Sequence, residues 1–578
     1  MSKEWLISPS WPDREVAARR WNVPPLVAQL LYNRGIDLNG APAAFLSPQL
    51  RDLNAPENLS GATEAARLIA EAVRAGQKIV LYGDYDVDGI CGVAILWQVL
   101  TSGGAKIEWY VPHRLEEGYG LNPEAIRTLL KDGAQVIVSI DCGITAVEEA
   151  RIVRQAGAVL IISDHHQPPA DLPQAAVLVH PLIDNGSAES CANPHLCGAG
   201  VAFKLAWAVA KALSGGERVQ PAFRDALMAT LPLAALGTVA DCVPLTGENR
   251  IIARHGLAAL KTSSNVGVQA LIQSAGLTGA NIDGYDAGFR LAPRLNAAGR
   301  MGHARLAVEL LTQADANRAR EIALYLEDHN RNRQAQERAI TKEACQMVEA
   351  RGMHRDACRG IVLAAEKWHA GVIGIVAARL VDRFQRPTVM IALENGLGQG
   401  SARSVPHFHM HQALSACAEH LETFGGHAMA AGLRIASARI AAFTEAFLAH
   451  ANQTLTGADL RSKLRLDAEV ELAELDVLTV QALRNLGPFG EGHPEPRLAT
   501  DWCNLVGEPR RVGKSSDHLQ FSLEHHGAIL KGIGFGLASA EEALKTHRRC
   551  RVAFAPILNE YNSRTSVELQ VLDFQFPQ

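Results

Sequence analysis

Apolar and polar positions alternate in blocks through the first half of the chain. Between about residues 60 and 260, the apolar runs "KIVLYGD", "AQVIVSID", "AVLIISD" and "AAVLVHP" are separated by stretches with helical spacing, such as "AVEEARIVRQAG". Strands that alternate with helices are typical of βαβ units and predict a parallel sheet. The first 50 residues contain one short helical pattern, "PPLVAQLLYNRGI", and we interpret them as an arm rather than a domain.

The pattern changes twice in the second half of the chain. Residues 303–351 form a polar stretch without proline, whose apolar residues recur at helical spacing and predict one long helix between two domains. A smaller α/β segment follows over 352–455, with the strand-like runs "GIVLAAE" and "PTVMIAL" on either side of the helix-like "GVIGIVAARLVDRF". From 456 to 578, short alternating runs such as "LRLDAEVEL" and "HLQFSLEHH" predict a small all-β barrel.

Length and composition allow several such domains. A chain of 578 residues, 48% of them hydrophobic, can bury more than one core. The predicted architecture is therefore α/β, with an arm at 1–50, a parallel-sheet domain at 51–302, a long connecting helix at 303–351, a second α/β domain at 352–455 and a barrel at 456–578.

Charge, cysteine content and apolar runs bear on nucleic-acid binding and on the cellular compartment. The net charge is −5, so any binding to nucleic acid must depend on local basic surfaces and on bound cations. The ten cysteines include no CxxC pair and lie mostly in apolar runs, which is typical of reduced, buried thiols. The start, "MSKEWLISPSWPDRE", has no apolar h-region, and lysine interrupts the longer apolar run "VAFKLAWAVAKAL". We therefore predict a cytoplasmic protein that does not enter a membrane.

Acids and histidines follow the predicted strands directly. They are Asp84, Asp86 and Asp88 after "KIVLYG", Asp141 after "VIVSI", Asp164, His165 and His166 after "LIIS", and Asp241 after the apolar run "LPLAALGTVA". Because ligands bind at the carboxyl ends of parallel strands, we expect these residues to converge. Crowded carboxylates repel one another, so such a site needs cations, and oxygen ligands with one or two imidazoles suit Mn²⁺ or Mg²⁺ better than zinc. Taken singly, each aspartate is more typical of a helix N-cap, and the prediction depends on their coincidence at successive strand ends.

Four motifs that contain these residues resemble those of the DHH phosphoesterases. They are "GDYDVDGICG", "SIDCGIT", "SDHHQP" and "GTVADCVPL", in that order. Further motifs, "LCGAGVAFKL", "RLAPRLNAAGRMGHA", "GSARS" and "FGGHAMAAGL", are similar to the RecJ branch of the family, and the resemblance extends from about residue 60 to 435. It implies a DHH catalytic domain, a DHHA1 domain that binds substrate, and a C-terminal OB fold.

The resemblance also implies the ligands of two divalent metal ions, Mn²⁺ or Mg²⁺. These are Asp84, Asp86, Asp88, Asp141, His165 and Asp241. The family pattern makes Asp141 the bridge between the ions and places His166 beside the scissile phosphate, where it orients the phosphate or the attacking water. Two such cations would polarise a phosphoryl group and stabilise the leaving oxygen. The predicted reaction is therefore phosphoester hydrolysis.

Arginines cluster just before the predicted long helix. The stretch "AGFRLAPRLNAAGRMGHAR" contains Arg290, Arg294, Arg300 and Arg305 and no acid. Arginine matches phosphate oxygens in bidentate geometry, although composition alone explains the stretch equally well as a solvated face. Because "PRLNAAGR" is a family motif, we predict that Arg290, Arg294, Asn296 and Arg300 contact the substrate backbone.

Two motifs of the second α/β domain predict a site for a terminal phosphate. "GSARS" offers hydroxyl and guanidinium donors beside a glycine that permits close approach, and "FGGHAMAAG" predicts a tight turn with a free imidazole. The predicted contacts are Ser401, Arg403, Ser404, Gly426 and His427, with Arg114 of "VPHRLEEGYGLN" as a further phosphate ligand.

The predicted barrel combines basic and aromatic residues. They are Arg510, Arg511, Lys514, Lys531, Arg548, Arg549 and Arg551, with Trp502, Phe521 and Tyr561 among the strands. Single-stranded nucleic acid suits such a surface because phosphates meet the charges and bases stack on the rings. The aromatic residues also fit a small core, and we expect both roles.

The resemblance implies a 5′→3′ exonuclease that degrades single-stranded DNA to 5′-mononucleotides in DNA repair and recombination. A second interpretation keeps the chemistry but takes cyclic dinucleotides, short oligoribonucleotides, pyrophosphate or polyphosphate as substrate. A third is a non-catalytic DNA-binding scaffold, which loss of the motif acids would indicate. The partners that the resemblance implies are single-stranded DNA, a RecQ-type helicase and a single-stranded-DNA-binding protein, and we expect a monomer.

Overall fold

The chain forms two compact units in the computed structural model. The structure describes residues 3–36, 42–113, 117–183, 193–216, 218–300, 303–562 and 564–577, with only the backbone of residue 300. The larger unit comprises Trp11–Asn330 and Asp476–Pro496, and the smaller unit comprises Met1–Ser10, Arg331–Leu475 and Arg497–Gln578.

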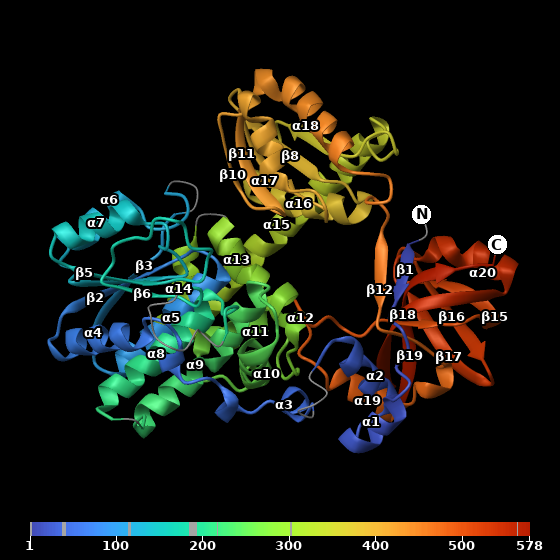
Figure 1. The fold of residues 1–578 in the computed structure, drawn as a ribbon, viewed down its shortest axis with the longest axis horizontal. Helices are drawn as coiled ribbons and strands as arrows, with labels where there is room; N and C mark the ends of the chain where they lie inside the picture. The colour runs from blue at the N-terminus through green and yellow to red at the C-terminus, as the bar shows by residue number, and fades with distance from the viewer. Residues whose placement is uncertain are drawn as a thin grey trace. The chain divides into compact units, whose positions relative to one another are not determined.

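The larger unit is built on a five-stranded sheet in the order β3-β2-β4-β5-β6, in which every pairing is parallel (Figure 1). Its strands are β2 Lys78–Gly83, β3 Lys106–Tyr110, β4 Val136–Ile140, β5 Val159–Ser163 and β6 Val177–Val179. Helices α4 Ala62–Arg74, α5 Val87–Ser102 and α8 Gly198–Ser214 contribute to the core on one face, and α6 Pro123–Lys131 and α7 Val147–Gln155 to the core on the other. The central strands β2, β4 and β5 are mostly apolar because both faces are covered, whereas the edge strand β3 contains Lys106 and Glu108. The prediction of a parallel sheet is confirmed.

After β6, the larger unit is helical. Its remaining elements in this region are α9 Pro221–Ala240, α10 Gly247–Leu260, α11 Val266–Ser274, α12 Gly284–Asp286, a π-helical turn Ala287–Leu291, α13 Ala292–Arg300 and α14 Ala304–Thr312. The run "LPLAALGTVA" is therefore the end of α9, and Asp241 follows a helix rather than a strand. A helix that is apolar all round because it is buried cannot be distinguished from a buried strand by periodicity. Within the part of the chain described, α9 alone is long and apolar enough to cross a membrane, but 56% of that stretch is buried in the protein, as in a core helix.

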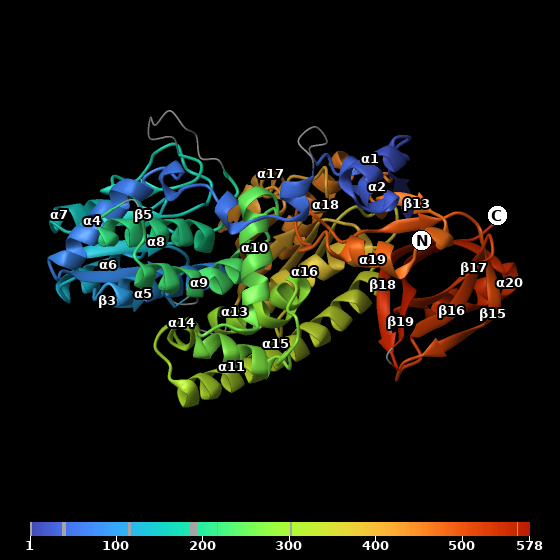
Figure 2. The ribbon, with the colours of Figure 1, turned by 90° about the horizontal axis from the view of Figure 1, so that it is seen from below.

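The long helix is α15, Ala316–Ala350, 35 residues in one continuous run (Figure 2). It begins after α14 rather than near residue 303. The Asp315 carboxylate accepts hydrogen bonds from the backbone N–H groups of Asn317 and Arg318, both at 2.9 Å. A side chain that satisfies the first N–H groups starts a new helix.

Residues 476–496 pack in a different unit from the residues on either side of them in the sequence. In the larger unit lie α1 Arg14–Trp21, α2 Pro25–Asn33, α3 Ala43–Leu46 and, from the C-terminal part of the chain, α19 Val477–Arg484. The Arg250 guanidinium donates to the carbonyl oxygens of Leu486 and Gly487, at 2.6 and 3.0 Å. Residues 476–496, which the sequence boundaries place in the barrel, therefore pack in the larger unit.

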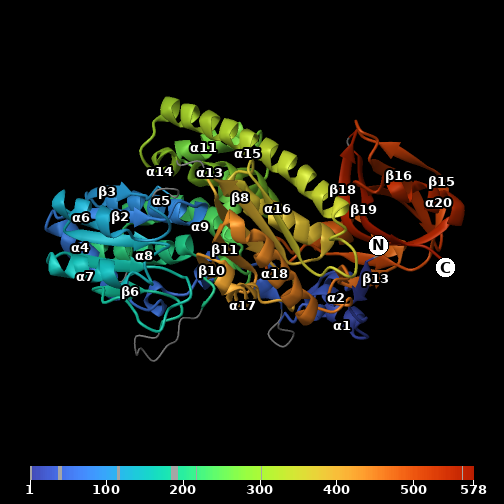
Figure 3. The ribbon, with the colours of Figure 1, turned by 90° about the horizontal axis from the view of Figure 1, so that it is seen from above.

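The smaller unit contains a mixed sheet in the order β10-β11-β9-β8-β7. Its strands are β7 Ile361–Ala365, β8 Thr388–Glu394, β9 Leu397–Arg403, β10 Thr423–Gly426 and β11 Ala430–Ala436. Residues of α15 and α16 Ala370–Phe384 form one core with the sheet, and residues of α17 Met410–Ala416 and α18 Ile440–Thr454 form another (Figure 3). Only β7 and β8 are parallel, so this domain is α/β but not doubly wound.

The C-terminal strands close into a barrel. They are β13 Ala468–Val470, β14 Leu498–Thr500, β15 Cys503–Val512, β16 His518–His525, β17 Ala528–Gly534, β18 Arg549–Tyr561 and β19 Arg564–Gln575, with α20 Glu541–His547 before β18. Because β18 pairs with both β15 and β19, and β17 pairs with both β16 and β19, the ladder from β15 to β19 returns on itself, as in an OB fold. Strand β1 Glu4–Ile7 of the arm pairs with β12 Lys463–Leu466 beside it. The predicted fold class, including the barrel, is confirmed.

Candidate metal centre

The predicted site residues at strand ends lie at one edge of the parallel sheet. Asp84 directly follows β2, Asp141 directly follows β4, and His165 is the second residue after β5. Asp141 has a φ of 63°, in the left-handed region that residues other than glycine seldom adopt. Such conformations concentrate at functional sites, where the surrounding structure holds them.

Asp86 and Asp88 occupy the beginning of α5. The Asp86 carboxylate caps the helix by accepting from the N–H groups of Asp88, at 2.9 Å, and Gly89, at 3.2 Å. The Asp88 carboxylate accepts from the first two N–H groups of α8, those of Gly198 at 2.5 Å and Ala199 at 2.9 Å. A helix N-terminus stabilises negative charge, so α8 holds Asp88 in place.

The acids converge on His165. Its Nε2 lies 3.1 Å from Oδ1 of Asp141, 3.7 Å from Oδ2 of Asp241 and 3.8 Å from Oδ2 of Asp88. Among the described residues, three overlapping sets have ligand atoms within 4.8 Å of one another: Asp84, Asp86 and Asp141; Asp88, His165 and Asp241; and Asp141, His165 and His166. Asp141 belongs to two of these sets, so its carboxylate could contact a cation held by either of them.

The chemistry of this cluster fits divalent cations. Oδ1 of Asp141 and Nε2 of His165 are buried and have no hydrogen-bond partner within the described part of the chain. In the same part of the chain, no lysine or arginine forms an ion pair with Asp86, Asp141 or Asp241. Buried charge without compensation is costly, and a set of hard oxygen donors with imidazole nitrogen is what Mn²⁺ and Mg²⁺ bind.

Burial and crowding shift the protonation of the cluster. Burial and the neighbouring aspartates raise the pKa of Asp141 well above its usual value, raise the pKa of Asp86, and raise the pKa of Asp241 to about 8. Burial lowers the pKa of His165, which keeps its imidazole neutral and able to donate a lone pair. A bound cation would reverse the shifts of the carboxylates, because a ligand must be deprotonated.

Asp164, which the sequence did not place among the ligands, holds the two histidines. It is buried and accepts hydrogen bonds from the N–H groups of Ile144, His165 and His166, at 2.9, 2.7 and 3.2 Å, and from Nδ1 of His166 at 2.8 Å. Although burial opposes both shifts, this hydrogen bond and the nearby charges lower the pKa of Asp164 and raise that of His166. A carboxylate that fixes a histidine behind a metal site tunes its orientation and basicity.

Tyr119 and two glycines complete the surroundings and gave no usable sequence signal. The Tyr119 hydroxyl lies 3.1 Å from Nδ1 of His166. A Cβ atom on Gly198 would lie 2.5 Å from Oδ1 of Asp141, and one on Gly237 would lie 2.6 Å from an Asp88 carboxylate oxygen. Both positions therefore need glycine for the carboxylates to fit.

Two arginines of the predicted patch before the long helix pair with acids that come from outside it. Arg290 donates to Asp286 at 2.9 Å and Arg294 pairs with Glu327 at 2.6 Å. Because a guanidinium paired with one carboxylate keeps further N–H groups, the predicted contacts of both arginines with substrate stay predictions. Asn296 instead accepts from the N–H of Val87 at 3.2 Å, beside the loop that carries Asp86 and Asp88. Arg114 and the side chain of Arg300 lie outside the described residues.

In the smaller unit, Arg403 and Ser401 lie together on β9. Nη1 of Arg403 is 3.3 Å from Oγ of Ser401 and donates to the Ala402 carbonyl at 2.8 Å, and no described acid forms an ion pair with Arg403. Burial lowers the pKa of this guanidinium. Ser404 differs: it is buried, and its hydroxyl donates to the Phe408 carbonyl at 2.5 Å, so its predicted phosphate contact is wrong.

The "FGGHAMAAG" motif forms the predicted tight turn. Gly426 ends β10 with a φ of 138°, and the N–H of His427 donates to the Ala430 carbonyl at 2.8 Å, which closes the hairpin to β11. The His427 side chain is exposed. Its predicted contact with substrate stays a prediction.

The barrel bears both expected kinds of residue. Phe521 is buried in the core, whereas Tyr561 is 73% exposed. Three of the basic residues are paired with acids: Arg511 with Glu541, Arg548 with Glu508 and Arg551 with Glu469. The positive surface of the barrel is therefore smaller than its composition indicates.

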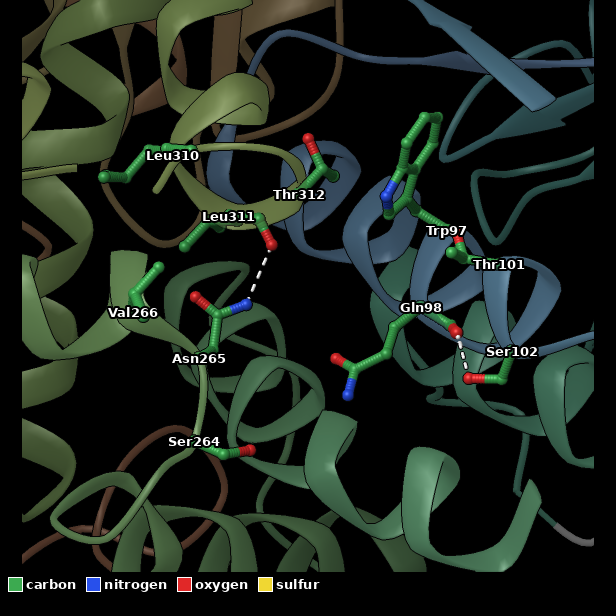
Figure 4. A pocket seen from close by; sticks show the side chains of 11 residues that line it. Trp97, Gln98, Thr101, Ser102, Ser264, Asn265, Val266, Leu310, Leu311 and Thr312 are labelled. Atoms are coloured by element: carbon green, nitrogen blue, oxygen red, sulfur yellow. Dashed lines mark hydrogen bonds between the residues drawn. The ribbon is translucent and has the colours of Figure 1, made fainter. Parts of the chain in front are cut away.

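A separate pocket of about 320 Å³ lies in the larger unit between α5, the start of α11 and the end of α14 (Figure 4). It is lined by Trp97, Gln98, Thr101, Ser102, Ser264, Asn265, Val266, Leu310, Leu311, Thr312 and Ala314. This lining has no charged residue and no histidine, so it offers neither metal ligands nor a counter-charge for phosphate.

Known proteins resemble this chain along most of its length. Family models match at residues 78–236 (DHH family, N-terminal domain), 359–456 (DHHA1 domain) and 466–573 (RecJ OB domain). The single-stranded-DNA-specific exonuclease RecJ of Bacillus subtilis is 35% identical over 96% of this chain and 68% of its own length, and that of Escherichia coli is 33% identical over 96% of both.

Solved structures agree with these sequence matches. The crystal structure of RecJ from Thermus thermophilus in complex with Mn²⁺ has a TM-score of 0.82 at 30% identity and covers all of this chain and 80% of its own. Its counterpart with Mg²⁺ has a TM-score of 0.77 at 29% identity over 100% and 79%. The resemblance that the sequence motifs indicated is confirmed, and the chain belongs to the RecJ family of single-stranded-DNA-specific exonucleases.

Proposed function

We propose that this chain is a 5′→3′ exonuclease that hydrolyses single-stranded DNA to 5′-mononucleotides with two divalent cations, Mn²⁺ or Mg²⁺. The observation that carries the proposal is the convergence of Asp88, Asp141 and Asp241 on Nε2 of His165, within 3.1 to 3.8 Å. Membership in the RecJ family supplies the substrate class.

The proposed ligands divide into two groups that meet at Asp141. Asp84 and Asp86 would hold one cation, Asp88, His165 and Asp241 the other, and the Asp141 carboxylate would contact both. Two cations at such a site polarise a phosphoryl group, activate water and stabilise the leaving oxygen. The carboxylates would fix the positions of the cations, and the N-terminus of α8 keeps Asp88 from rotating away.

His166 is proposed to orient the scissile phosphate. Its raised pKa favours the imidazolium, and its hydrogen bond to Asp164 holds the ring while 43% of the side chain stays exposed. A cationic donor in this position can hold a non-bridging phosphate oxygen through a charge-assisted hydrogen bond. Because the ring is fixed before substrate arrives, little reorganisation accompanies the reaction.

Arg403 and Ser401 are proposed to bind the 5′-terminal phosphate, with Gly426 and His427 at the terminal nucleotide. The support is a half-buried guanidinium without an acidic partner among the described residues, next to a hydroxyl. If the terminal phosphate is held there, hydrolysis of the next phosphodiester releases a 5′-mononucleotide and leaves a new 5′ phosphate. A repeated cycle of this kind gives 5′→3′ polarity.

The alternatives fit the chain less well. Cyclic dinucleotides or polyphosphate do not need a barrel, and this chain has one that matches the RecJ OB domain. A non-catalytic scaffold does not need six acids and two histidines at one point, and none of the motif acids is missing.

Hydrolysis by the parent protein and by an Asp141→Ala variant tests the proposal. We expect the parent with Mn²⁺ to degrade single-stranded DNA, to leave duplex DNA and cyclic dinucleotides largely intact, and to be inactive in EDTA. Duplex should resist because unstacking and unpairing a base cost a few kcal/mol. Cyclic dinucleotides as the preferred substrate, or full activity of Asp141→Ala, would refute it.

The proposed setting is DNA repair and recombination in the cytoplasm. The family resemblance implies a RecQ-type helicase and a single-stranded-DNA-binding protein as partners, and we propose both for a monomeric enzyme. Co-purification of either protein with the full chain would test this part separately.

A further inference from the structure

A charged groove follows the seam between α15 and α16 in the smaller unit, where Figure 3 shows the two helices side by side. Its volume is about 330 Å³. The lining residues are Arg338, Thr341, Lys342, Cys345, Gln346 and Glu349 of α15 and Arg379 and Arg383 of α16.

The groove is positive in a chain that is negative overall. Its lining has four cations and one acid, a net charge of 4 − 1 = +3, whereas the whole chain carries −5. Arg338 and Lys342 are exposed, and neither forms an ion pair with an acid within the described residues. These two cations are the part of the groove most open to an anionic ligand.

The other two cations are held in place. Arg379 pairs with Glu337, a carboxylate that is only 3% exposed and also accepts from Arg333 at 2.9 Å. Arg383 pairs with Glu349 at 2.9 Å. Each guanidinium has five donors, so an arginine fixed by one carboxylate still has N–H groups for a ligand.

The floor of the groove is firm and contains an unsatisfied polar group. Cys345 belongs to the hydrophobic core that α15 and α16 share, so this packing holds the two sides of the groove together. Oγ1 of Thr341 is buried and has no hydrogen-bond partner within the described part of the chain. Buried polar groups are nearly always satisfied, which indicates that water or a ligand supplies the partner.

We propose that this groove binds the phosphodiester backbone of a nucleic-acid strand, outside the metal centre. Guanidinium groups match phosphate oxygens, and the cations recur four residues apart on each helix, which places them about 5–6 Å apart along the groove. A polymer with regularly spaced charges fits this repeat better than a single small anion does. The inference rests on the proposed function for the identity of the strand, and it adds a binding surface that raises affinity for single-stranded DNA without taking part in hydrolysis.

An Arg338→Ala/Lys342→Ala variant of the full chain tests the groove. Both residues are exposed and form no ion pair with a described acid, so their removal leaves no buried acid without a partner. Binding of labelled single-stranded DNA is measured in EDTA, so that no hydrolysis occurs, over a range of salt concentrations. We expect weaker binding and a shallower salt dependence, by about 0.7 for each phosphate that the variant no longer neutralises, with an unchanged melting temperature.

The matched control is Arg127→Ala/Lys131→Ala, which removes the same charge from two positions four residues apart on α6. It should bind as the parent does. If the parent binds DNA and the groove variant shows the same affinity and salt dependence, the groove inference is wrong and the proposed function stands. Binding of labelled polyglutamate is measured in parallel. A groove variant that loses binding to polyglutamate but not to DNA would also overturn the groove inference, in favour of an acidic protein partner. A parent that does not bind single-stranded DNA would overturn both.

Discussion

Nε2 of His165 lies 3.1 Å from Oδ1 of Asp141, yet neither atom makes a hydrogen bond within the part of the chain that the structure describes. Burial lowers the pKa of the histidine and raises that of the aspartate. Without a bound cation, the imidazole therefore favours its neutral form and the carboxyl group its protonated form. A cation bound by both atoms would satisfy them, which makes this pair the most direct structural sign of a metal centre.

Replacing Asp141 with alanine should separate function from folding. We expect hydrolysis in Mn²⁺ to fall by about 10²-fold or more, because several kcal/mol of charge stabilisation depend on the cations. The metal-free variant should melt at or above the temperature of the metal-free parent, since one of several crowded anions is gone. Melting curves in EDTA make the comparison, and a variant that melts far below the parent would assign Asp141 a structural role.

The metal-free protein should lose stability as pH rises through the range in which Asp241 ionises. The folded-state pKa of Asp241 is about 8 against an ordinary value of 3.8, so between these values the folded protein binds more protons than the unfolded chain. The free energy of unfolding therefore falls with rising pH in this window.

The matched variant for this pH effect is Asp241→Asn, which has no proton to lose. Urea unfolding in EDTA at several pH values between about 4 and 8 should show a shallower fall for the variant than for the parent. Saturating Mn²⁺ should also reduce the fall in the parent, because the cation favours the ionised carboxylate. Parallel curves for parent and variant would mean that Asp241 does not titrate in this window.

The sequence predicted the part of the site that lies at strand ends. Asp84, Asp141 and His165 follow β2, β4 and β5. The apolar runs of these three strands are long enough for the strands to be identified from the sequence. Asp241 was selected for its apolar neighbours but follows helix α9, and the motif resemblance rather than the strand argument identified it correctly as a neighbour of His165.

Interactions between distant segments could not be predicted from the sequence. The pairing of Arg294 with Glu327 joins residues on different helices, and local composition contains no sign of it. Similarly, the carboxylate of Asp88 depends on the N-terminus of α8, which lies more than a hundred positions away. The break before α15 was missed because an Asp315 cap leaves the helical periodicity almost unchanged.

Asp164→Asn should impair hydrolysis although Asp164 is not among the proposed ligands. The amide can still accept one hydrogen bond but cannot match the charge that holds His166, so the ring should lose its orientation and its raised pKa. Loss of such a partner typically costs about 10- to 100-fold in activity or metal affinity, that is, roughly 1–3 kcal/mol. The pH profile of hydrolysis should change in shape as well as in height, and an unchanged profile would leave Asp164 with a purely structural role.

Arg403→Ala should remove the preference for 5′-phosphorylated over 5′-hydroxyl ends while leaving metal binding intact. Initial rates on both kinds of end measure the preference. Ser404→Ala is the control from the same motif: its hydroxyl is used by the Phe408 carbonyl, so the change should cost about 1 kcal/mol of stability and leave the preference unchanged. If Arg403→Ala discriminates as the parent does, the terminal phosphate is bound elsewhere.

The order in which nucleotides leave the strand distinguishes a metal-dependent 5′→3′ exonuclease from the alternatives in one measurement. Single-stranded DNA labelled at either its 5′ or its 3′ end is incubated with the full chain and Mn²⁺, with a parallel sample in EDTA. We expect the 5′ label to appear at once as a mononucleotide, the 3′-labelled strand to shorten progressively, and both strands to stay intact in EDTA. Immediate release of the 3′ label, or hydrolysis that continues in EDTA, would contradict the proposed polarity or the proposed metal centre.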